Sequence, residues 1–150
     1  MSKFAGLALG TSQAARMIIM HPITGQPLRQ RETGAEAYLE MLSRDSDVAR
    51  RCDRAATDKQ LRSRGRRLTA EEIEGNQLEK LAKLTRGWSL VDLDGNPMEV
   101  PFSEATAREL YAEPSLAWLR DQAQAFSDDL GNYPREPSKS SSTSPVTSTV

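Results

Sequence analysis

Apolar residues recur with a strand-like spacing in the first third of the chain. Residues 16–20 (RMIIM) form a short apolar run, and proline and glycine crowd the positions that follow, so a strand running into a turn is predicted. Apolar and mostly polar residues alternate between Ala35 and Leu42, which predicts a second strand. Tyr38 and Leu42 break the alternation, so a helix stays open as an alternative. As strands, the two segments pair in a hairpin around a charged loop at 29–34.

The spacing becomes helical after residue 44. Asp45 or Ser46 is predicted to cap a first helix that reaches about Ser63 and carries a thin apolar stripe. Thr69-Ala70-Glu71-Glu72 is a capping box that predicts the start of a second helix, which has the strongest amphipathic pattern of the chain. The apolar positions are Val48, Cys52, Ala55 or Ala56 and Leu61 in the first helix, and Ile73, Leu78, Leu81, Ala82 and Thr85 in the second.

Two further helices are predicted towards the C-terminus. Ser103 caps the first of them, which runs to about Ala112. Pro114 suits the first turn of the last helix, because the N–H that proline lacks would be unbonded there anyway. Gly131 is predicted to stop this helix. Its buried stripe is expected at Leu119, Ala123, Phe126 and Leu130.

The segment 85–103 (TRGWSLVDLDGNPMEVPFS) connects the second and third helices. Gly87 is predicted to end the second helix, since glycine favours the left-handed position just past a helix. The turn Asp94-Gly95-Asn96-Pro97 between half-apolar strands predicts a short hairpin. High solvent exposure of both Trp88 and Phe102 would contradict a role for them in the core. The residues expected in the core are Trp88, Phe102, Leu119 and Phe126.

These elements predict a mainly α protein with a small β component. An N-terminal β-hairpin is followed by about four helices, with a second short hairpin between helices two and three. The length of 150 residues suits one domain, expected at 16–133. Residues 1–15 are expected to be poorly ordered, and the Ser/Thr/Pro-rich residues 134–150 disordered. No internal repeat is found.

Charge is distributed unevenly although the net charge is −1. Residues 43–68 hold nine Lys/Arg and four Asp/Glu, whereas residues 69–136 hold six and fourteen. Such asymmetry can organise self-association or partner docking, but ordinary solvated charge on helices is the favoured interpretation. The basic residues of the first helix region would suit phosphates, but no aromatic residue accompanies them, so a solvated or subunit-facing helix is favoured over a nucleic-acid reader. These residues are Arg50, Arg51, Arg54, Lys59, Arg62, Arg64, Arg66 and Arg67.

Residues suited to catalysis or metal binding are few. Cys52 is the single cysteine and is expected to be a small buried hydrophobe, whereas His21 is the single histidine and is expected in a turn. The carboxylates Asp92 and Asp94 lack the spacing of a calcium loop and are interpreted as turn residues, and the pair at 128–129 adds no ligand set. No enzyme activity, metal or cofactor is expected.

The N-terminal strand is the candidate for partner contact. An apolar run on both faces of a strand requires a partner sheet, helix or subunit, unless the same domain buries it. The candidate residues for partner binding or oligomer contact are Met17, Ile18, Ile19, Met20, Arg50, Arg51 and Arg54. The chain has no apolar stretch of the ~20 residues that span a bilayer, and its start is a poor match to a signal peptide. A cytoplasmic location is expected.

Several short strings between Met20 and Tyr133 resemble the tail assembly chaperones of long-tailed bacteriophages. A HPITGQPL turn and SRDSDVARR precede a helix that ends in LAKLTRGW. The hairpin and cap DGNPMEVPFS follow, and ARELYAEPSLAWLRDQ comes next. TRGW and PFS, joined by the acidic hairpin, are the most distinctive parts of the resemblance.

The resemblance implies a small helical protein with a β-hairpin that acts during tail assembly in the cytoplasm of the bacterial host. Such chaperones coat the tape-measure protein, keep it soluble and help to recruit tail-tube subunits. They are absent from the finished virion, and many have a longer form made by frameshifting. The family has no active-site residues, and a homo-oligomer is expected. The alternatives are another small morphogenesis protein, such as a tail completion factor or head–tail connector, and a nucleic-acid-binding regulator.

Overall fold

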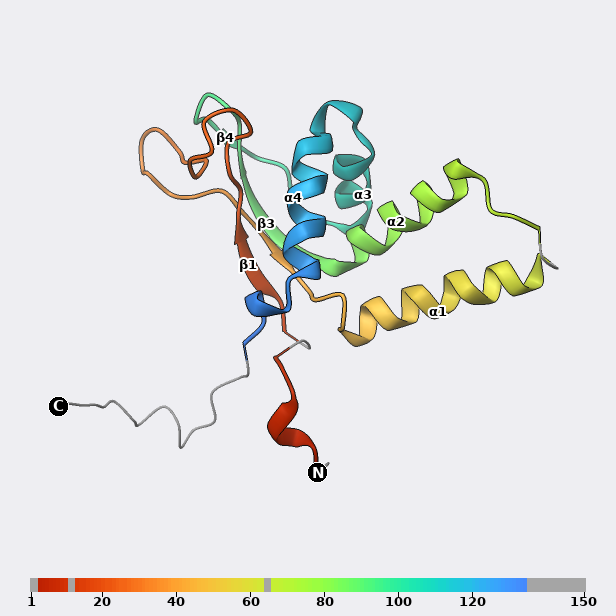
Figure 1. The fold of residues 1–150 in the computed structure, drawn as a ribbon. Helices are drawn as coiled ribbons and strands as arrows, with labels where there is room; N and C mark the ends of the chain where they lie inside the picture. Colours follow the sequence, from red (N-terminus) through yellow and green to blue (C-terminus); the bar gives the residue numbers. More distant parts are fainter. Residues whose placement is uncertain (1–2, 11–12, 64–65, 135–150) are drawn as a thin grey trace.

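The computed structural model describes residues 3–10, 13–63 and 66–134 and confirms the predicted mainly α fold with a small β component (Figure 1). The predicted tail therefore falls, apart from Pro134, outside the described residues. The helices are α1 (Asp47–Arg62), α2 (Ala70–Leu84), α3 (Glu104–Ala112) and α4 (Ala117–Asp128). The strands are β1 (Ala15–Ile18), β2 (Tyr38–Met41), β3 (Thr85–Val91) and β4 (Pro97–Met98). Short 3₁₀ turns are η1 (Ala5–Leu7), η2 (Pro114–Leu116) and η3 (Leu130–Asn132).

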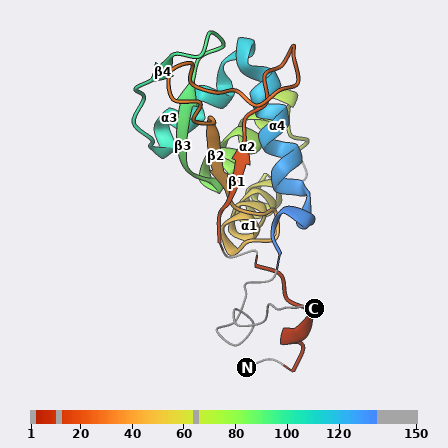
Figure 2. The same ribbon diagram turned by 90° about the vertical axis from the view of Figure 1, so that its left-hand side faces the viewer.

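The four strands form one antiparallel sheet in the order β1-β2-β3-β4, so β2 and β3 are central. The helices lie on one side of the sheet, and Figure 2 looks onto the other side. Alternation along β2 explains this arrangement: Leu39 and Met41 are fully buried, whereas Tyr38 and Glu40 are half-buried. On the half-open face, the Arg16 guanidinium stacks 3.8 Å from the centre of the Tyr38 ring.

The connection between β1 and β2 contains the same type of turn twice. Thr24-Gly25 and Thr33-Gly34 stand nine positions apart, and both glycines have positive φ, 71° and 72°. Each glycine N–H donates to the carbonyl four residues earlier at 2.9 Å, and each threonine Oγ1 accepts from the N–H two residues later. The charged loop predicted at 29–34 is therefore a compact turn, closed by a bridge between Arg29 and Glu36.

Three backbone hydrogen bonds join the ends of these turns. Ile19 donates to Ala37, Ala37 to Leu28, and Leu28 back to Ile19, at 2.9, 2.8 and 2.9 Å. The three side chains are all buried. The two turns are thus held against each other at one end of the sheet.

The predicted helix end at Gly87 is wrong, because α2 ends at Leu84 and β3 begins at once. Thr85 is both the C-cap of α2 and the first residue of β3, where it pairs with Met41. Gly87 lies within β3, where a Cβ would come 2.6 Å from the Glu40 Oε1. Pairing with a strand some 40 residues earlier therefore overrides the local stop signal.

The hairpin predicted after β3 is confirmed. Gly95 has a positive φ of 91°, and its own carbonyl accepts from the Arg31 N–H at 2.9 Å, which docks the hairpin onto the second Thr-Gly turn. Asp92 Oδ1 accepts from the N–H groups of Asp94 and Asn96, both at 2.9 Å. These hydrogen bonds hold the turn together, and they also lower the pKa of Asp92.

The starts of the helices agree with the prediction more closely than their ends do. Ser46, Thr69 and Ser103 cap α1, α2 and α3, and the capping box of α2 is complete. Hydrogen bonds from Arg66 and the Thr69 backbone lower the pKa of Glu72 to about 2. The last helix differs from the prediction: Pro114 begins η2, which leads into α4 at Ala117, and α4 ends at Asp128 rather than at Gly131.

Buried hydroxyls fasten the helices to the sheet. Thr85 Oγ1 lies 2.6 Å from Tyr111 OH, while Ser127 Oγ donates to the Leu42 carbonyl at 2.9 Å. Tyr133 OH donates to the Met41 carbonyl at 3.1 Å, and its ring packs edge-on against Phe126. Each hydroxyl has a partner, so its burial leaves no unsatisfied polar group.

The two buried phenols predict a loss of stability at alkaline pH. Burial raises the pKa of Tyr111 to about 12 and also raises that of Tyr133. The folded state thus keeps both protons above the ordinary pKa of about 10. The stabilisation is fully present below pH 10 and is lost as the pH rises towards 12, by about 1.4 kcal/mol per pH unit for Tyr111. Urea unfolding at several pH values should show this slope, and Tyr111→Phe should flatten it. An unchanged slope in that variant would contradict the assignment to Tyr111.

Candidate partner-binding surfaces

The apolar strand predicted for partner contact lies largely in the core. Met17 and Ile19 are 4% and 1% exposed, whereas Ile18 and Met20 are half-buried. The side-chain amide of Gln122 in α4 brackets Met20: Oε1 accepts from the Met20 N–H at 3.0 Å and Nε2 donates to its carbonyl at 2.8 Å. Gln122 thereby occupies the backbone groups that another strand would use at this position. The partly exposed side chains of this run are those of Ile18 and Met20, and the backbone of Met20 is covered.

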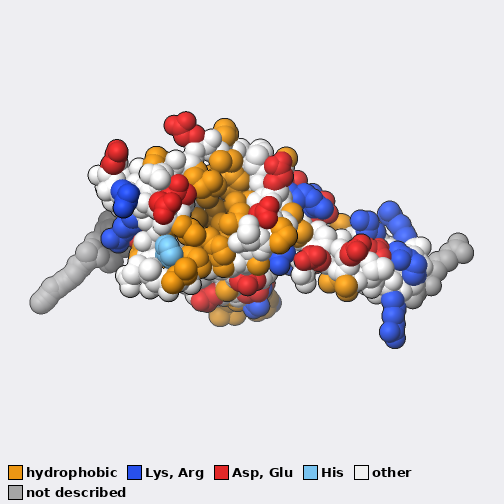
Figure 3. Space-filling model, turned by 90° about the horizontal axis from the view of Figure 1, so that it is seen from above, with side chains coloured by type: hydrophobic (Ala, Val, Ile, Leu, Met, Phe, Trp, Pro, Cys, Tyr) orange, Lys and Arg blue, Asp and Glu red, His pale blue; other side chains and the backbone are white. Residues whose placement is uncertain are grey.

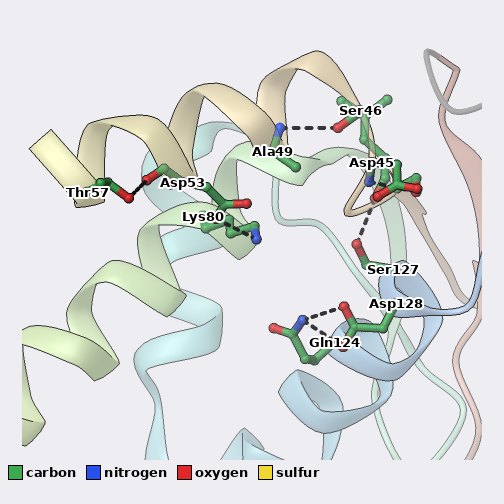
Figure 4. Close-up of polar contacts among 11 residues, drawn as sticks. Asp45, Ser46, Ala49, Asp53, Thr57, Lys80, Gln124, Ser127 and Asp128 are labelled. Atoms are coloured by element: carbon green, nitrogen blue, oxygen red, sulfur yellow. Dashed lines mark hydrogen bonds and ion pairs between the residues drawn. The ribbon is translucent and has the colours of Figure 1, made fainter.

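Helices α1 and α2 form an arm that projects away from the sheet (Figure 1). Ala49 is the one fully buried residue of α1, so the outer part of the helix is solvated. The base of α1 is fixed by Ser46 Oγ, which accepts from the Ala49 N–H at 3.2 Å, and by the ion pair of Lys80 with Asp53 at 2.8 Å (Figure 4). The same close-up shows Ser127 of α4 beside this base. α1 is therefore fixed near its N-terminal end, and α2 is also tied to α4 by the ion pair of Glu74 with Arg120 at 3.4 Å.

A groove of about 500 Å³ runs between α1 and α2. Four of its eight α1 lining residues are small or apolar and four are charged, whereas all of its α2 lining residues are polar or charged. The lining residues are Val48, Arg51, Cys52, Ala55, Ala56, Asp58, Lys59 and Arg62 from α1, and Asn76, Glu79, Lys80 and Lys83 from α2. Cys52 is half-buried in this wall, where burial raises the pKa of its thiol. Cys52, which is expected from the sequence to be a buried hydrophobe, thus lines a groove.

The three arginines predicted as contacts do not act together. Arg51 lines the groove. Arg50 pairs with Asp47 at 3.7 Å and donates to the Asp45 carbonyl at 2.6 Å, outside the groove. Arg54 is exposed and is not part of the groove lining. The sequence alone does not predict the groove, because it depends on the angle between two helices.

A second surface lies at the end of the molecule formed by the sheet turns and the α3–α4 junction. Seen from above, hydrophobic side chains gather there in a continuous band (Figure 3). Trp88 and Phe102 pack edge-on with ring centres 5.0 Å apart, and the Trp88 indole donates to the Val100 carbonyl at 2.7 Å. Both aromatic rings are half-buried against the core, whereas Met98 and Val100 are 45% and 37% exposed. We call Trp88, Met98, Val100 and Phe102 the apolar cluster.

The remaining candidate residues lie in a turn or in the core. His21 lies in the first Thr-Gly turn, where its Nδ1 accepts from the Ile23 N–H at 3.1 Å. Leu119 is buried in the core and Phe126 packs against it. Within the described residues, no three His, Cys, Asp or Glu side chains come together as a metal site. None of the helices in that part of the chain is long and apolar enough to cross a membrane.

Comparisons of the chain with protein-family models, with curated proteins and with solved structures found no match.

Proposed function

We propose that the protein is a tail assembly chaperone of a long-tailed bacteriophage. It binds the tape-measure protein, keeps it soluble and promotes tail-tube polymerisation in the cytoplasm of the bacterial host. The strings between Met20 and Tyr133 that resemble this family support the proposal. The structural observation that carries it is the apolar cluster, because an exposed apolar patch on a small protein is a typical partner surface.

The chemistry of the client suits this surface. A tape-measure protein is a very long amphipathic helix, so its chaperone needs adaptable apolar contacts and no catalytic groups. Met98 pairs with Leu90, two residues along β3 from Trp88, and offers a flexible, polarisable contact. Many copies, each with a modest surface, would hold one client through avidity. A homo-oligomer, a frameshifted longer form and the tail-tube protein are the further partners that we propose.

Co-expression with the tape-measure protein of the same genome tests the function. We expect a soluble complex on size-exclusion chromatography, and Met98→Glu with Val100→Glu should weaken it. Each buried apolar side chain contributes roughly 1.5–3 kcal/mol, so a loss of at least about tenfold in affinity is expected. Leu61→Glu is the matched control, since Leu61 is 72% exposed at the far end of α1. It should leave the complex intact.

Two outcomes would contradict the proposed function. One is a tape-measure protein whose solubility does not change and that forms no complex with the chain. The other is salt-dependent retention of DNA or RNA that is lost when Arg50, Arg51 and Arg54 are replaced by glutamate. That second result would favour a nucleic-acid-binding regulator.

A further inference from the structure

The groove between α1 and α2 has the layout of a helical bundle that lacks one helix. Its α1 wall places Val48, Cys52, Ala55 and Lys59 at spacings of four, three and four. Its α2 wall places Asn76, Lys80 and Lys83 at spacings of four and three. Such spacing follows one face of each helix and is the spacing of a coiled-coil seam, with small or apolar side chains on α1 only. The small side chains of α1 let a third helix approach closely.

The charges around the groove define what can enter it. Arg51, Lys59, Arg62 and Lys83 line it, and none of the four forms an ion pair with any described residue. The acidic lining residues are only Asp58 and Glu79. Lys80 is already paired with Asp53 at 2.8 Å. The free cations thus leave the groove with a positive surplus.

This surplus argues against two occupants. A second copy placed groove to groove would bring its own unpaired cations against these, which is repulsive. A nucleic acid would find no aromatic ring among the lining residues on which a base could stack, and its phosphates would face the apolar wall. An acidic helix has neither disadvantage.

We propose that the groove binds an amphipathic helix of a partner protein whose apolar stripe is flanked by Asp and Glu. The stripe packs on Val48, Cys52 and Ala55, and the flanking carboxylates face the free cations of the rim. The 16 residues of α1 span about 24 Å, so the occupant is a helix of roughly four turns. That this helix belongs to the tape-measure protein rests on the proposed function, whereas the chemistry of the occupant does not.

Labelled synthetic peptides test the inference on the full-length protein by fluorescence anisotropy. One peptide is a helix of about 18 residues with a leucine stripe flanked by glutamates, and its matched partner carries lysines at the flanks. We expect the acidic peptide to bind at least about tenfold more tightly. The groove variants Lys59→Glu and Ala55→Glu should each weaken it by about tenfold. Arg54→Glu is the matched charge control and should stay within about twofold, since Arg54 lies outside the groove.

The inference is overturned if the lysine peptide binds as tightly as the acidic one, or if Arg54→Glu weakens binding as much as Lys59→Glu. Displacement of the acidic peptide by an equal charge of duplex DNA, with the same variants affected, would also overturn it. Circular dichroism of each variant confirms that the fold is kept. If the acidic peptide fails to bind but the tape-measure complex forms, the groove inference is wrong and the proposed function stands. If the peptide binds but no tape-measure complex forms, the groove inference stands and the proposed function is wrong.

Discussion

Leu39→Ala is expected to lower the free energy of unfolding by about 3 kcal/mol, within the 2–5 kcal/mol typical of such a truncation. Leu39 is fully buried in β2, where it pairs with Met17 of β1 and Trp88 of β3. A cavity there is surrounded on both sides by hydrogen-bonded strands, which limits how far the structure can collapse into it. Since domains are stable by about 5–15 kcal/mol, the variant should unfold at a clearly lower urea concentration.

Ile23→Ala is the control for this measurement. Ile23 is 86% exposed at the first Thr-Gly turn, so its truncation should change stability by no more than about 0.5 kcal/mol. If the two variants lose equal stability, the assignment of Leu39 to the centre of the core is contradicted. The free energy of unfolding should fall with urea concentration at the same slope in both variants if the unfolded states are alike.

Tyr133→Ala should destabilise the protein by about 3–5 kcal/mol, as truncation of a buried aromatic residue does. Tyr133 is 1% exposed, packs on Phe126 and donates its hydroxyl hydrogen to the Met41 carbonyl. Tyr133→Phe keeps the ring and removes only the hydroxyl, so it should cost about 1–2 kcal/mol. Thermal and urea unfolding of the two variants separate the packing contribution from the hydrogen bond. An alanine variant no less stable than the phenylalanine one would contradict the role of the ring.

Local chemistry in the sequence is sufficient to predict most element starts. Thr69 with Glu72, and Ser103 with Thr106, satisfy backbone donors within one turn of chain, so their effect does not depend on the rest of the fold. The turn at Gly95 is predictable for the same reason. The repeated Thr-Gly turns also have a visible signal, the two dipeptides nine positions apart, but it is too short to stand out.

Features that depend on distant residues are not predictable in this way. The end of α2 is set by the pairing of Thr85 with Met41. No local pattern near Gly87 indicates that pairing. The groove depends on how α1 leans on α2, which the Lys80–Asp53 ion pair helps to fix across 27 positions. The apolar run predicts a strand that is apolar on both faces, but it cannot show that Gln122 bonds the backbone of Met20, just past the end of β1.

The bracket that Gln122 places on Met20 has a consequence for the newborn chain. The two residues are 102 positions apart, so Met20 leaves the ribosome long before its cover exists. At about 5–20 residues per second, the backbone groups of Met20 stay open for roughly 5–20 seconds of synthesis. Neighbouring nascent chains on one messenger could pair through them during that interval. The chain thus passes through a vulnerable period that ends when α4 is made.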